Sequence, residues 1–225
     1  MTQKCGYIAI LGRPNAGKSS LLNTLVGQKI AGVSAKPQTT RARILGIRIE
    51  GEAQLLFLDT PGIHRSPRKV ALNSLMNRSA WGVLNEADAV LYIIDAADEE
   101  GMDADFDFLR NVVKSSKVPV LVCLNKADKI RHEQQTEPFY SCQSLMQRVR
   151  DSLGEPEASV ALLPDPVFIS AKRKESLTPI LAQLSTMVPE GSWLYPADDL
   201  TDRPQTFVCA ELIREQAFRC LGAEL

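Results

Sequence analysis

Gly12-Arg13-Pro14-Asn15-Ala16-Gly17-Lys18-Ser19 is the stretch that decides the fold of this chain. It follows the pattern glycine, four residues, glycine, lysine, and serine or threonine. The two glycines let the backbone curl so that its N–H groups converge on a β-phosphate. In such a loop Lys18 reaches the β- and γ-phosphates, and the Ser19 hydroxyl binds magnesium. An apolar run at residues 7–11 precedes the loop and a helical pattern at 20–26 follows it, so the context predicts a strand, a phosphate-binding loop and a helix.

The composition is that of a soluble globular protein. Of 225 residues, 44% are hydrophobic and 24% are charged. No run approaches the ~18 apolar residues of a membrane span, and the first residues do not predict a secretory signal. The five cysteines lack metal-ligand spacing, which favours reduced, unpaired thiols in a cytosolic protein. With a net charge of −1, a nucleic-acid partner would need a local basic patch.

Strands and helices alternate along the chain. Predicted strands lie at 7–11, 44–49, 54–58, 89–95, 119–124 and 167–169, and apolar residues recur at helical spacing within 20–26, 72–84, 106–113, 145–153 and 180–187. This order predicts a three-layer α/β fold with a mostly parallel six-stranded sheet. The second and third strands have no helix between them, so one edge of the sheet should be antiparallel.

The chain divides into three predicted parts. Residues 1–188 form the α/β domain, and 189–204, rich in Pro, Gly and Asp, form a linker. Residues 205–225 would add a short partial α+β segment, with a strand at Thr206-Phe207-Val208-Cys209 and a helix that carries Leu212, Ile213, Ala217, Cys220 and Leu221 on one face. About twenty residues cannot bury a core alone. This segment therefore either begins a second domain or docks on the first.

Three aspartates precede a glycine by three positions, and context separates them. Asp59 ends a buried strand and begins Asp59-Thr60-Pro61-Gly62. There its carboxylate can hold a magnesium-bound water, and the Gly62 N–H can meet a γ-phosphate. Asp98 lies in an acidic run that favours a hydrated helix start, and Asp151 lies where a helix passes into a loop. Asp59 is therefore the predicted functional residue.

Asn125-Lys126-Ala127-Asp128 indicates recognition of guanine. A carboxylate accepts two hydrogen bonds from the N1–H and 2-amino edge of guanine, and adenine lacks both donors. The Lys126 stem can cover the face of the ring. Ser170-Ala171-Lys172 follows the last predicted strand, where the Ala171 N–H could meet the guanine oxygen. Together with the phosphate loop, these motifs predict that GTP and GDP bind.

The set of motifs resembles the translation-factor-type GTPases, and within them the Era family. The resemblance rests on residues 12–19, Gln38-Thr39-Thr40-Arg41, residues 59–62, Thr201-Asp202-Arg203-Pro204-Gln205, Ala210-Glu211-Leu212-Ile213-Arg214-Glu215, Phe218 and Leu221-Gly222-Ala223-Glu224-Leu225. It implies a role in 30S small ribosomal subunit assembly and 16S rRNA processing, with small-subunit ribosomal RNA as partner. It also implies that residues 205–225 begin a KH-type RNA-binding domain, incomplete here because no Gly-x-x-Gly clamp follows. A cytoplasmic monomer, with peripheral association at the inner membrane, is the corresponding expectation.

The resemblance further implies that residues 38–41 are an effector loop in which Thr40, or Thr39, reaches magnesium; a solvated threonine pair is the alternative. Ras-like enzymes place a water-orienting glutamine after the Asp-x-x-Gly glycine, whereas this chain has Ile63. Asn15 could instead hold K⁺ beside the phosphates, as in related GTPases, or it could simply brace the loop.

The predicted catalytic set is Lys18, Thr40, Asn15 and Gly62, and the predicted Mg²⁺ ligands are Ser19, Thr40 and Asp59. The predicted nucleotide contacts are Gly12, Arg13, Pro14, Asn15, Ala16, Gly17, Lys18, Ser19, Ser20, Asp59, Thr60, Pro61, Gly62, Ile63, Asn125, Lys126, Asp128, Ser170, Ala171 and Lys172.

Four functions remain compatible with these motifs. The favoured one is hydrolysis of GTP to GDP and phosphate as a switch for an RNA-binding module. The others are an RNA-binding assembly factor that uses GTP only as a conformational ligand, a P-loop kinase, and another ribosome-assembly or tRNA-modification GTPase. The residues at 125–128 argue against the kinase, and the C-terminal stretch favours the Era family.

Overall fold

The computed structural model describes residues 2–33, 43–59, 82–130, 147–148, 151 and 166–220. The elements along the chain are β1 (Lys4–Gly12), α1 (Lys18–Val26), β2 (Ile44–Glu50), β3 (Ala53–Asp59), β4 (Ala89–Asp95), α3 (Glu99–Ser115), β5 (Val120–Asn125), η1 (Ala127–Lys129), β6 (Val167–Phe168), η2 (Lys174–Leu177), α6 (Thr178–Met187) and α7 (Gln205–Cys220). Residues 82–86 are also helical, as are 147–148 and 151, in agreement with the periodicity of those regions.

The strands form one six-stranded sheet in the order β2-β3-β1-β4-β5-β6. All neighbours pair in parallel except β2 and β3, which are antiparallel, so the predicted sheet and its antiparallel edge are confirmed. Every residue of β3 and of β5 is buried. Strands covered on both faces need apolar side chains at successive positions, and this explains the unbroken apolar runs in the sequence.

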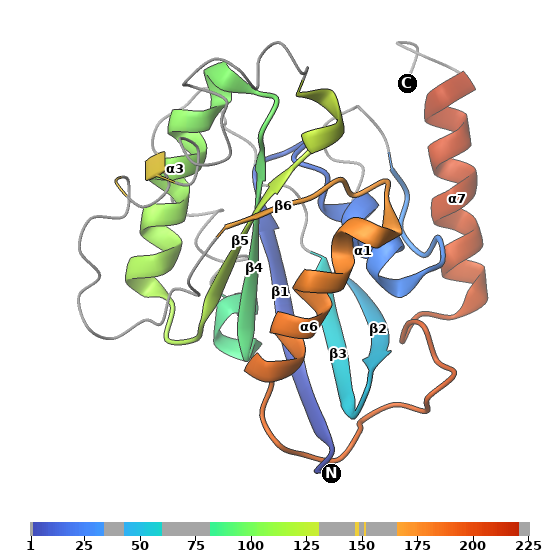
Figure 1. Ribbon diagram of the computed structural model, residues 1–225. Coiled ribbons are helices and arrows are strands. Elements are labelled where there is room, and N and C mark those ends of the chain that lie inside the picture. Colours follow the sequence, from blue (N-terminus) through green and yellow to red (C-terminus); the bar gives the residue numbers. More distant parts are fainter. Residues whose placement is uncertain are drawn as a thin grey trace.

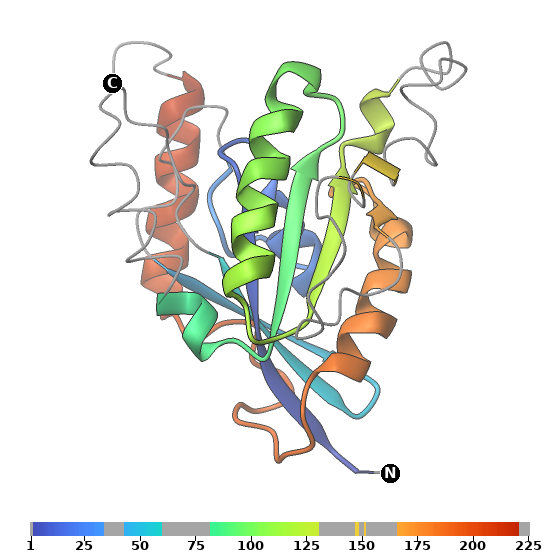
Figure 2. The same cartoon turned by 90° about the vertical axis from the view of Figure 1, so that its left-hand side faces the viewer.

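Helices cover both faces of the sheet (Figures 1 and 2). Alternate residues of β1 point to opposite sides, so that Ala9 and Leu11 join a core with α3, whereas Ile8 and Ile10 join a core with α1 and α6. The result is the predicted three-layer arrangement. In this arrangement α1 begins just after the carboxyl end of β1, and α3 begins just after the carboxyl end of β4.

The helix ends follow the sequence signals. α1 ends at Gly27, whose φ of 85° is left-handed and whose N–H donates to the Asn23 carbonyl at 3.0 Å. Asp98 is the N-cap of α3, because its side chain accepts a hydrogen bond from the Gly101 N–H at 3.1 Å. The prediction of a helix start at Asp98, rather than a second phosphate-sensing aspartate, is confirmed.

Residues 189–204, the predicted linker, run against the amino-terminal end of the sheet and then along its β2 edge. The Gln54 amide donates to the Tyr195 carbonyl at 2.8 Å, and the Ile47 N–H donates to the Leu200 carbonyl at 2.9 Å. The division into a domain, a linker and the start of a second domain stays a prediction, but this stretch is fastened to the sheet at several points.

The predicted strand at residues 206–209 is wrong, because these residues form the first turns of α7 (Figure 1). The Phe207 and Val208 N–H groups both bond the Pro204 carbonyl, which starts the helix. The residues that follow, from Ala210 to Glu215, favour helix strongly enough to outweigh four residues with strand propensity.

α7 packs against the α/β domain through acidic side chains. The Glu215 side chain is 1% exposed, pairs with Lys29 at 2.7 Å and accepts a hydrogen bond from the Val33 N–H at 3.0 Å. Ile213, on the predicted apolar face, is 70% exposed. The helix therefore docks through buried carboxylates and through Phe207, which packs against the core, whereas Ile213 of the expected apolar stripe faces solvent.

The carboxyl ends of the parallel strands gather the motif residues at one end of the sheet. Gly12 ends β1, Asp59 ends β3, Asp95 ends β4 and Asn125 ends β5. Open α/β sheets bind their ligands at this end. Within the described ranges, no helix has the length and apolar character needed to cross a membrane. Cys5, Cys123, Cys209 and Cys220 are unpaired as predicted, whereas Cys142 lies outside the described residues.

Candidate functional site: a phosphate loop joined to a guanine pocket

The phosphate loop adopts the backbone that the motif requires. Asn15 and Gly17 have positive φ values of 63° and 101°. A Cβ on Gly17 would lie 2.4 Å from Asn125 Nδ2, so this position excludes any side chain. α1 begins at the next residue, Lys18, and the N–H groups of its first turn lie beside the loop. A helix N-terminus of this kind binds anions.

Carbonyl groups of the phosphate loop hold the Lys18 side chain in place. Its side chain is buried, and its Nζ donates to the carbonyls of Gly12 at 2.9 Å and Arg13 at 2.7 Å. These bonds use two of the three ammonium donors, which leaves a third for a phosphate oxygen. Burial lowers the pKa of Lys18, whereas the carboxylates of Asp59 and Asp105 act to raise it. The lysine is thus a pre-positioned cation.

Asp59 and Ser19, the predicted Mg²⁺ ligands that the structure describes, are in direct contact beside the phosphate loop. Ser19 Oγ donates to Asp59 Oδ2 at 2.7 Å, and Asp59 is fully buried. Burial raises the pKa of Asp59 to about 6, against the opposing effects of Lys18 and Ser19. Asp59 Oδ1 is buried without a hydrogen-bond partner among the described residues. A hard divalent cation such as Mg²⁺ would satisfy that oxygen, so these two residues fit the predicted ion.

Asn125 ties the phosphate loop to the base-binding loops. Its Nδ2 donates to the Ala16 carbonyl at 2.7 Å, and its Oδ1 accepts from the Ala171 N–H at 2.9 Å. Both bonds are buried, and they hold the loops after β1, β5 and β6 together. The Ala171 N–H, which the sequence predicts to meet a guanine oxygen, donates to Asn125 in this structure.

Asp128 lies at the mouth of the resulting cavity, exposed and next to Ser170. Ser170 Oγ donates to Asp128 Oδ1 at 2.7 Å, and this bond is the main reason that the pKa of Asp128 lies below its usual value. The cavity, about 120 Å³, is lined by Gly17, Ser20, Asn125, Lys126, Asp128, Lys129, Ser170, Ala171 and Lys172. Three motifs far apart in the sequence therefore line one space.

Lys126 has a partner that the sequence motifs did not reveal. It has a left-handed backbone, with φ of 64°, and its Nζ forms an ion pair with Asp95 Oδ2. Asp95 is the last residue of β4 and is paired in register with Asn125. The sequence did carry one signal for this contact, because Asp95 ends the predicted strand that precedes the strand leading to residues 125–128. The ion pair fixes the direction of the lysine stem along the cavity rim.

Several predicted site residues are placed differently or lie outside the description. The Arg13 side chain points away from the cavity toward α3, where its Nη1 donates to the Gly101 carbonyl at 2.7 Å. Asn15 is exposed. Thr40, Thr60, Pro61, Gly62 and Ile63 lie outside the described residues, as does the rest of the predicted effector loop.

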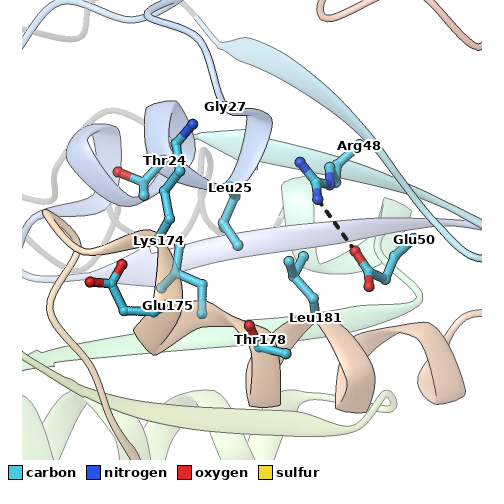
Figure 3. Close-up of a pocket in the computed structure, with 10 residues that line it drawn as sticks. Thr24, Leu25, Gly27, Arg48, Glu50, Lys174, Glu175, Thr178 and Leu181 are labelled. Atoms are coloured by element: carbon cyan, nitrogen blue, oxygen red, sulfur yellow. Dashed lines mark hydrogen bonds and ion pairs between the residues drawn. The ribbon is translucent and has the colours of Figure 1, made fainter.

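A second and larger hollow, of about 300 Å³, lies elsewhere on the domain (Figure 3). It is bounded by Thr24, Leu25 and Gly27 at the C-terminal end of α1, by β2, and by η2 and α6. Arg48 and Glu50 of β2 pair across 3.5 Å beside it. The negative end of a helix dipole disfavours phosphate, so of these two hollows the smaller one, beside the phosphate loop, better suits a phosphate-bearing ligand.

Known proteins match both the sequence and the fold. The family model described as 50S ribosome-binding GTPase matches residues 7–126. GTPase Era of Ectopseudomonas mendocina (strain ymp) is 40% identical over 222 residues, which cover 99% of this chain and 68% of the relative. An Aquifex aeolicus Era variant bound to GDP and AlF4⁻ superposes with a TM-score of 0.76 at 36% identity, over 96% of this chain and 68% of that one. Era in complex with MgGDPNP and nucleotides 1506–1542 of 16S ribosomal RNA gives 0.75 at 36% identity, over 96% and 67%.

Proposed function

The chain belongs to the Era family of GTPases, and we propose that it hydrolyses GTP in the cavity between the phosphate loop and Asp128 as a switch in small ribosomal subunit assembly. The GTPase domain and the GTPase relatives identify it as a GTP-hydrolysing enzyme. The observation that supports this site above all is the double hydrogen bond of Asn125, to Ala16 and to Ala171. It makes the phosphate-binding and base-selecting loops parts of one site.

In the proposed mode, the guanine edge lies against the Asp128 carboxylate and the phosphates lie at the N-terminus of α1. The Lys126 stem covers one face of the base, directed by its ion pair with Asp95. The Lys172 N–H follows Ala171 in the same turn, and we assign it to the guanine oxygen in place of the Ala171 N–H. The other predicted nucleotide contacts remain part of this proposal.

The chemistry follows from charge placement. Water attacks the γ-phosphorus, the bond from phosphorus to the β–γ bridging oxygen breaks, and GDP keeps that oxygen. The Lys18 ammonium lies beside the β- and γ-phosphates, where negative charge shifts as the bond breaks. Ser19 and Asp59, with Thr40 as the proposed third ligand, would hold Mg²⁺, and the bound ion would neutralise charge on the phosphate oxygens.

No glutamine follows Gly62 to orient the attacking water, because that position is Ile63. We assign part of this role to the Gly62 N–H and part to K⁺ held by Asn15. The exposed, left-handed Asn15 at the rim of the phosphate loop supports the assignment. Hydrolysis measured in KCl and in NaCl tests it: the wild type should be faster in KCl, and Asn15→Ala should turn over equally in both salts. A wild type that is indifferent to the cation would remove K⁺ from the proposal.

The partner we propose is small-subunit ribosomal RNA, engaged by a KH-type domain that residues 205–225 would begin. A relative's complex with a 16S ribosomal RNA segment supports this assignment. A labelled RNA with the sequence of that segment, titrated with protein loaded with MgGDPNP or MgGDP, is the corresponding test. Equal affinity in both nucleotide states would contradict a GTP-controlled role. A cytoplasmic monomer that associates peripherally with the inner membrane also remains a proposal.

The decisive experiment is binding of GTP, ATP and XTP to the purified protein with Mg²⁺ present, together with multiple-turnover release of phosphate. We expect GTP to bind much more tightly than ATP, and phosphate to accumulate beyond one equivalent. Equal retention of adenine and guanine nucleotides would refute the assignment of the site. Binding without turnover would instead favour a nucleotide-gated assembly factor.

A further inference from the structure

α3 carries a buried carboxylate that the hydrolysis of GTP does not use directly. Asp105 has no exposed surface, although a lone aspartate is rarely buried. Its Oδ2 lies 3.4 Å from Arg13 Nη1, and the Tyr92 hydroxyl of β4 contacts its carbonyl at 3.1 Å and its Oδ1 at 3.4 Å. The carboxylate therefore lies between the core of the sheet and the second residue of the phosphate loop.

The Arg13 guanidinium donates hydrogen bonds to several acceptors at the start of α3. Besides Asp105, its Nη1 donates to the Gly101 carbonyl at 2.7 Å and to Asp98 Oδ2 at 3.2 Å. The fit at Gly101 is close: a Cβ added there would lie 1.9 Å from Arg13 Nη1. The same Cβ would lie 2.1 Å from Asp98 Oδ2, so a side chain at this position would displace both the arginine and the N-cap carboxylate.

The same arginine holds the lysine that binds phosphate. The Arg13 carbonyl accepts a hydrogen bond from Lys18 Nζ at 2.7 Å, so the residue is anchored to α3 by its side chain and to Lys18 by its main chain. A continuous series of contacts runs from Tyr92 through Asp105 and Arg13 to the Lys18 ammonium. A shift of Arg13 would move one of the two carbonyls that direct Lys18.

The pKa shifts of Asp105 and Lys18 are consistent with these contacts. Burial raises the pKa of Asp105 to about 6, Arg13 and the Tyr92 hydroxyl lower it, and Asp98 raises it. The charged form of Asp105 in turn favours the ammonium form of Lys18, whose pKa burial lowers. At neutral pH the ionised carboxylate is paired with Arg13 and supports the positive charge that the phosphates require.

We propose that Asp105 is a positioning residue for GTP binding, which through Arg13 fixes the start of the phosphate loop and the place of Lys18. The proposal rests on the nucleotide site described above. It assigns to α3 a part in binding phosphate although no residue of that helix lines the cavity.

Asp105→Asn tests the proposal, and Asp107→Asn is the matched control. Asp107 lies two residues along the same helix, where it pairs with Arg110 on the surface. At pH 7.5 we expect the first variant to bind GTP and GDP about tenfold more weakly, the loss expected for one hydrogen bond to a charged group, and the second to match the wild type. As the pH falls toward 5, the wild type and Asp105→Asn should converge, because Asp105 is then protonated and resembles asparagine.

Gly101→Ala provides a variant that leaves every charge in place and adds only a methyl group to α3. Because its Cβ would displace both Arg13 and the Asp98 carboxylate, we expect a similar loss of affinity, with a lower melting temperature because α3 also loses its N-cap. Arg13→Met closes the cycle: if Asp105 acts through Arg13, adding Asp105→Asn to Arg13→Met should cost no further affinity.

Wild-type affinity in Gly101→Ala, or an undiminished tenfold loss from Asp105→Asn in the Arg13→Met background, would overturn the inference. These outcomes are distinct from failure of the proposed function, in which the wild type itself would not bind guanine nucleotides.

Discussion

Asp59 and Asp128 are two carboxylates of the proposed nucleotide site, and their surroundings are opposite. Asp59 is fully buried at the end of β3, where burial raises its pKa to about 6 and where Oδ1 has no hydrogen-bond partner among the residues that the structure describes. Asp128 is exposed on the loop after β5, where the Ser170 hydroxyl lowers its pKa. Ionisation of Asp59 therefore costs free energy in the empty protein, whereas Asp128 is already ionised before a base binds.

This difference separates the two tasks of the site. A buried carboxylate with an unsatisfied oxygen gains most when a cation arrives, so binding energy accumulates at the metal position. A carboxylate already fixed as an anion can accept two hydrogen bonds from a base with little reorganisation, which suits discrimination between guanine and adenine. Each of the following predictions changes one member of this pair.

Asp128→Asn should have the largest effect. Guanine loses a charged acceptor of two hydrogen bonds, each worth about 2 kcal/mol, so the affinity for GTP should fall about a thousandfold. XTP, which presents a carbonyl in place of the 2-amino group, should become the preferred ligand. Competition of GTP, XTP and ATP against a labelled guanine nucleotide measures the change. The base assignment fails if GTP still outcompetes XTP.

Asp59→Asn should stabilise the empty protein at neutral pH. Because the folded-state pKa of about 6 lies above the ordinary value of 3.8, the fold favours the protonated acid; this stabilisation is present below about pH 4 and is lost as the pH rises through 6. The amide is neutral at all pH values and avoids that loss. At pH 7.5 we expect a gain of up to about 3 kcal/mol in the free energy of unfolding, and none at pH 4.

Urea unfolding of both proteins, each measured without and with Mg²⁺ and GDP, would show this gain. Bound Mg²⁺ and GDP should reduce or remove it, because Mg²⁺ pairs with the wild-type carboxylate and therefore stabilises the wild type more than the variant. A gain of the same size at pH 4 would show that ionisation of Asp59 is not the cause.

The same substitution should slow hydrolysis by about a hundredfold, since Mg²⁺ loses an anionic partner while base recognition is untouched. Single-turnover hydrolysis across a Mg²⁺ titration should give a half-saturating concentration at least about tenfold above that of the wild type. The preference for GTP over ATP should not change. A wild-type Mg²⁺ dependence would place the ion elsewhere.

Ser170→Ala should have the smallest effect. Because Asp128 is exposed and water can replace the lost partner, removing this hydrogen bond should cost only about 1 kcal/mol, so GTP should bind about fivefold more weakly. Without the hydroxyl, the pKa of Asp128 should rise toward its ordinary value, and GTP binding should therefore be lost at a higher pH on acidification. Ser185→Ala, which removes an exposed hydroxyl bonded within α6, is the control. Identical acid limbs for the variant and the wild type would show that Ser170 does not tune Asp128.

Much of the fold could be predicted because it depends on local patterns. The apolar runs of β1, β3, β4 and β5 indicate strands buried on both faces, and Gly27 and Asp98 mark helix ends by their own conformational preferences. The strand expected at 206–209 failed for the opposite reason. Four residues with strand propensity belong to a longer helix, which is held by Glu215 against Lys29 and Val33.

By itself the sequence determined that this protein binds a guanine nucleotide, because residues 12–19 and 125–128 each carry their chemistry within one short loop. Only the tertiary structure decided that Asn125 joins those loops, that Asp95 pairs with Lys126, and that Arg13 pairs with Asp105 of α3. A local motif fixes backbone shape and residue type. Contacts between residues 31 to 109 positions apart depend on how the strands are ordered in the sheet, and no short segment records that order.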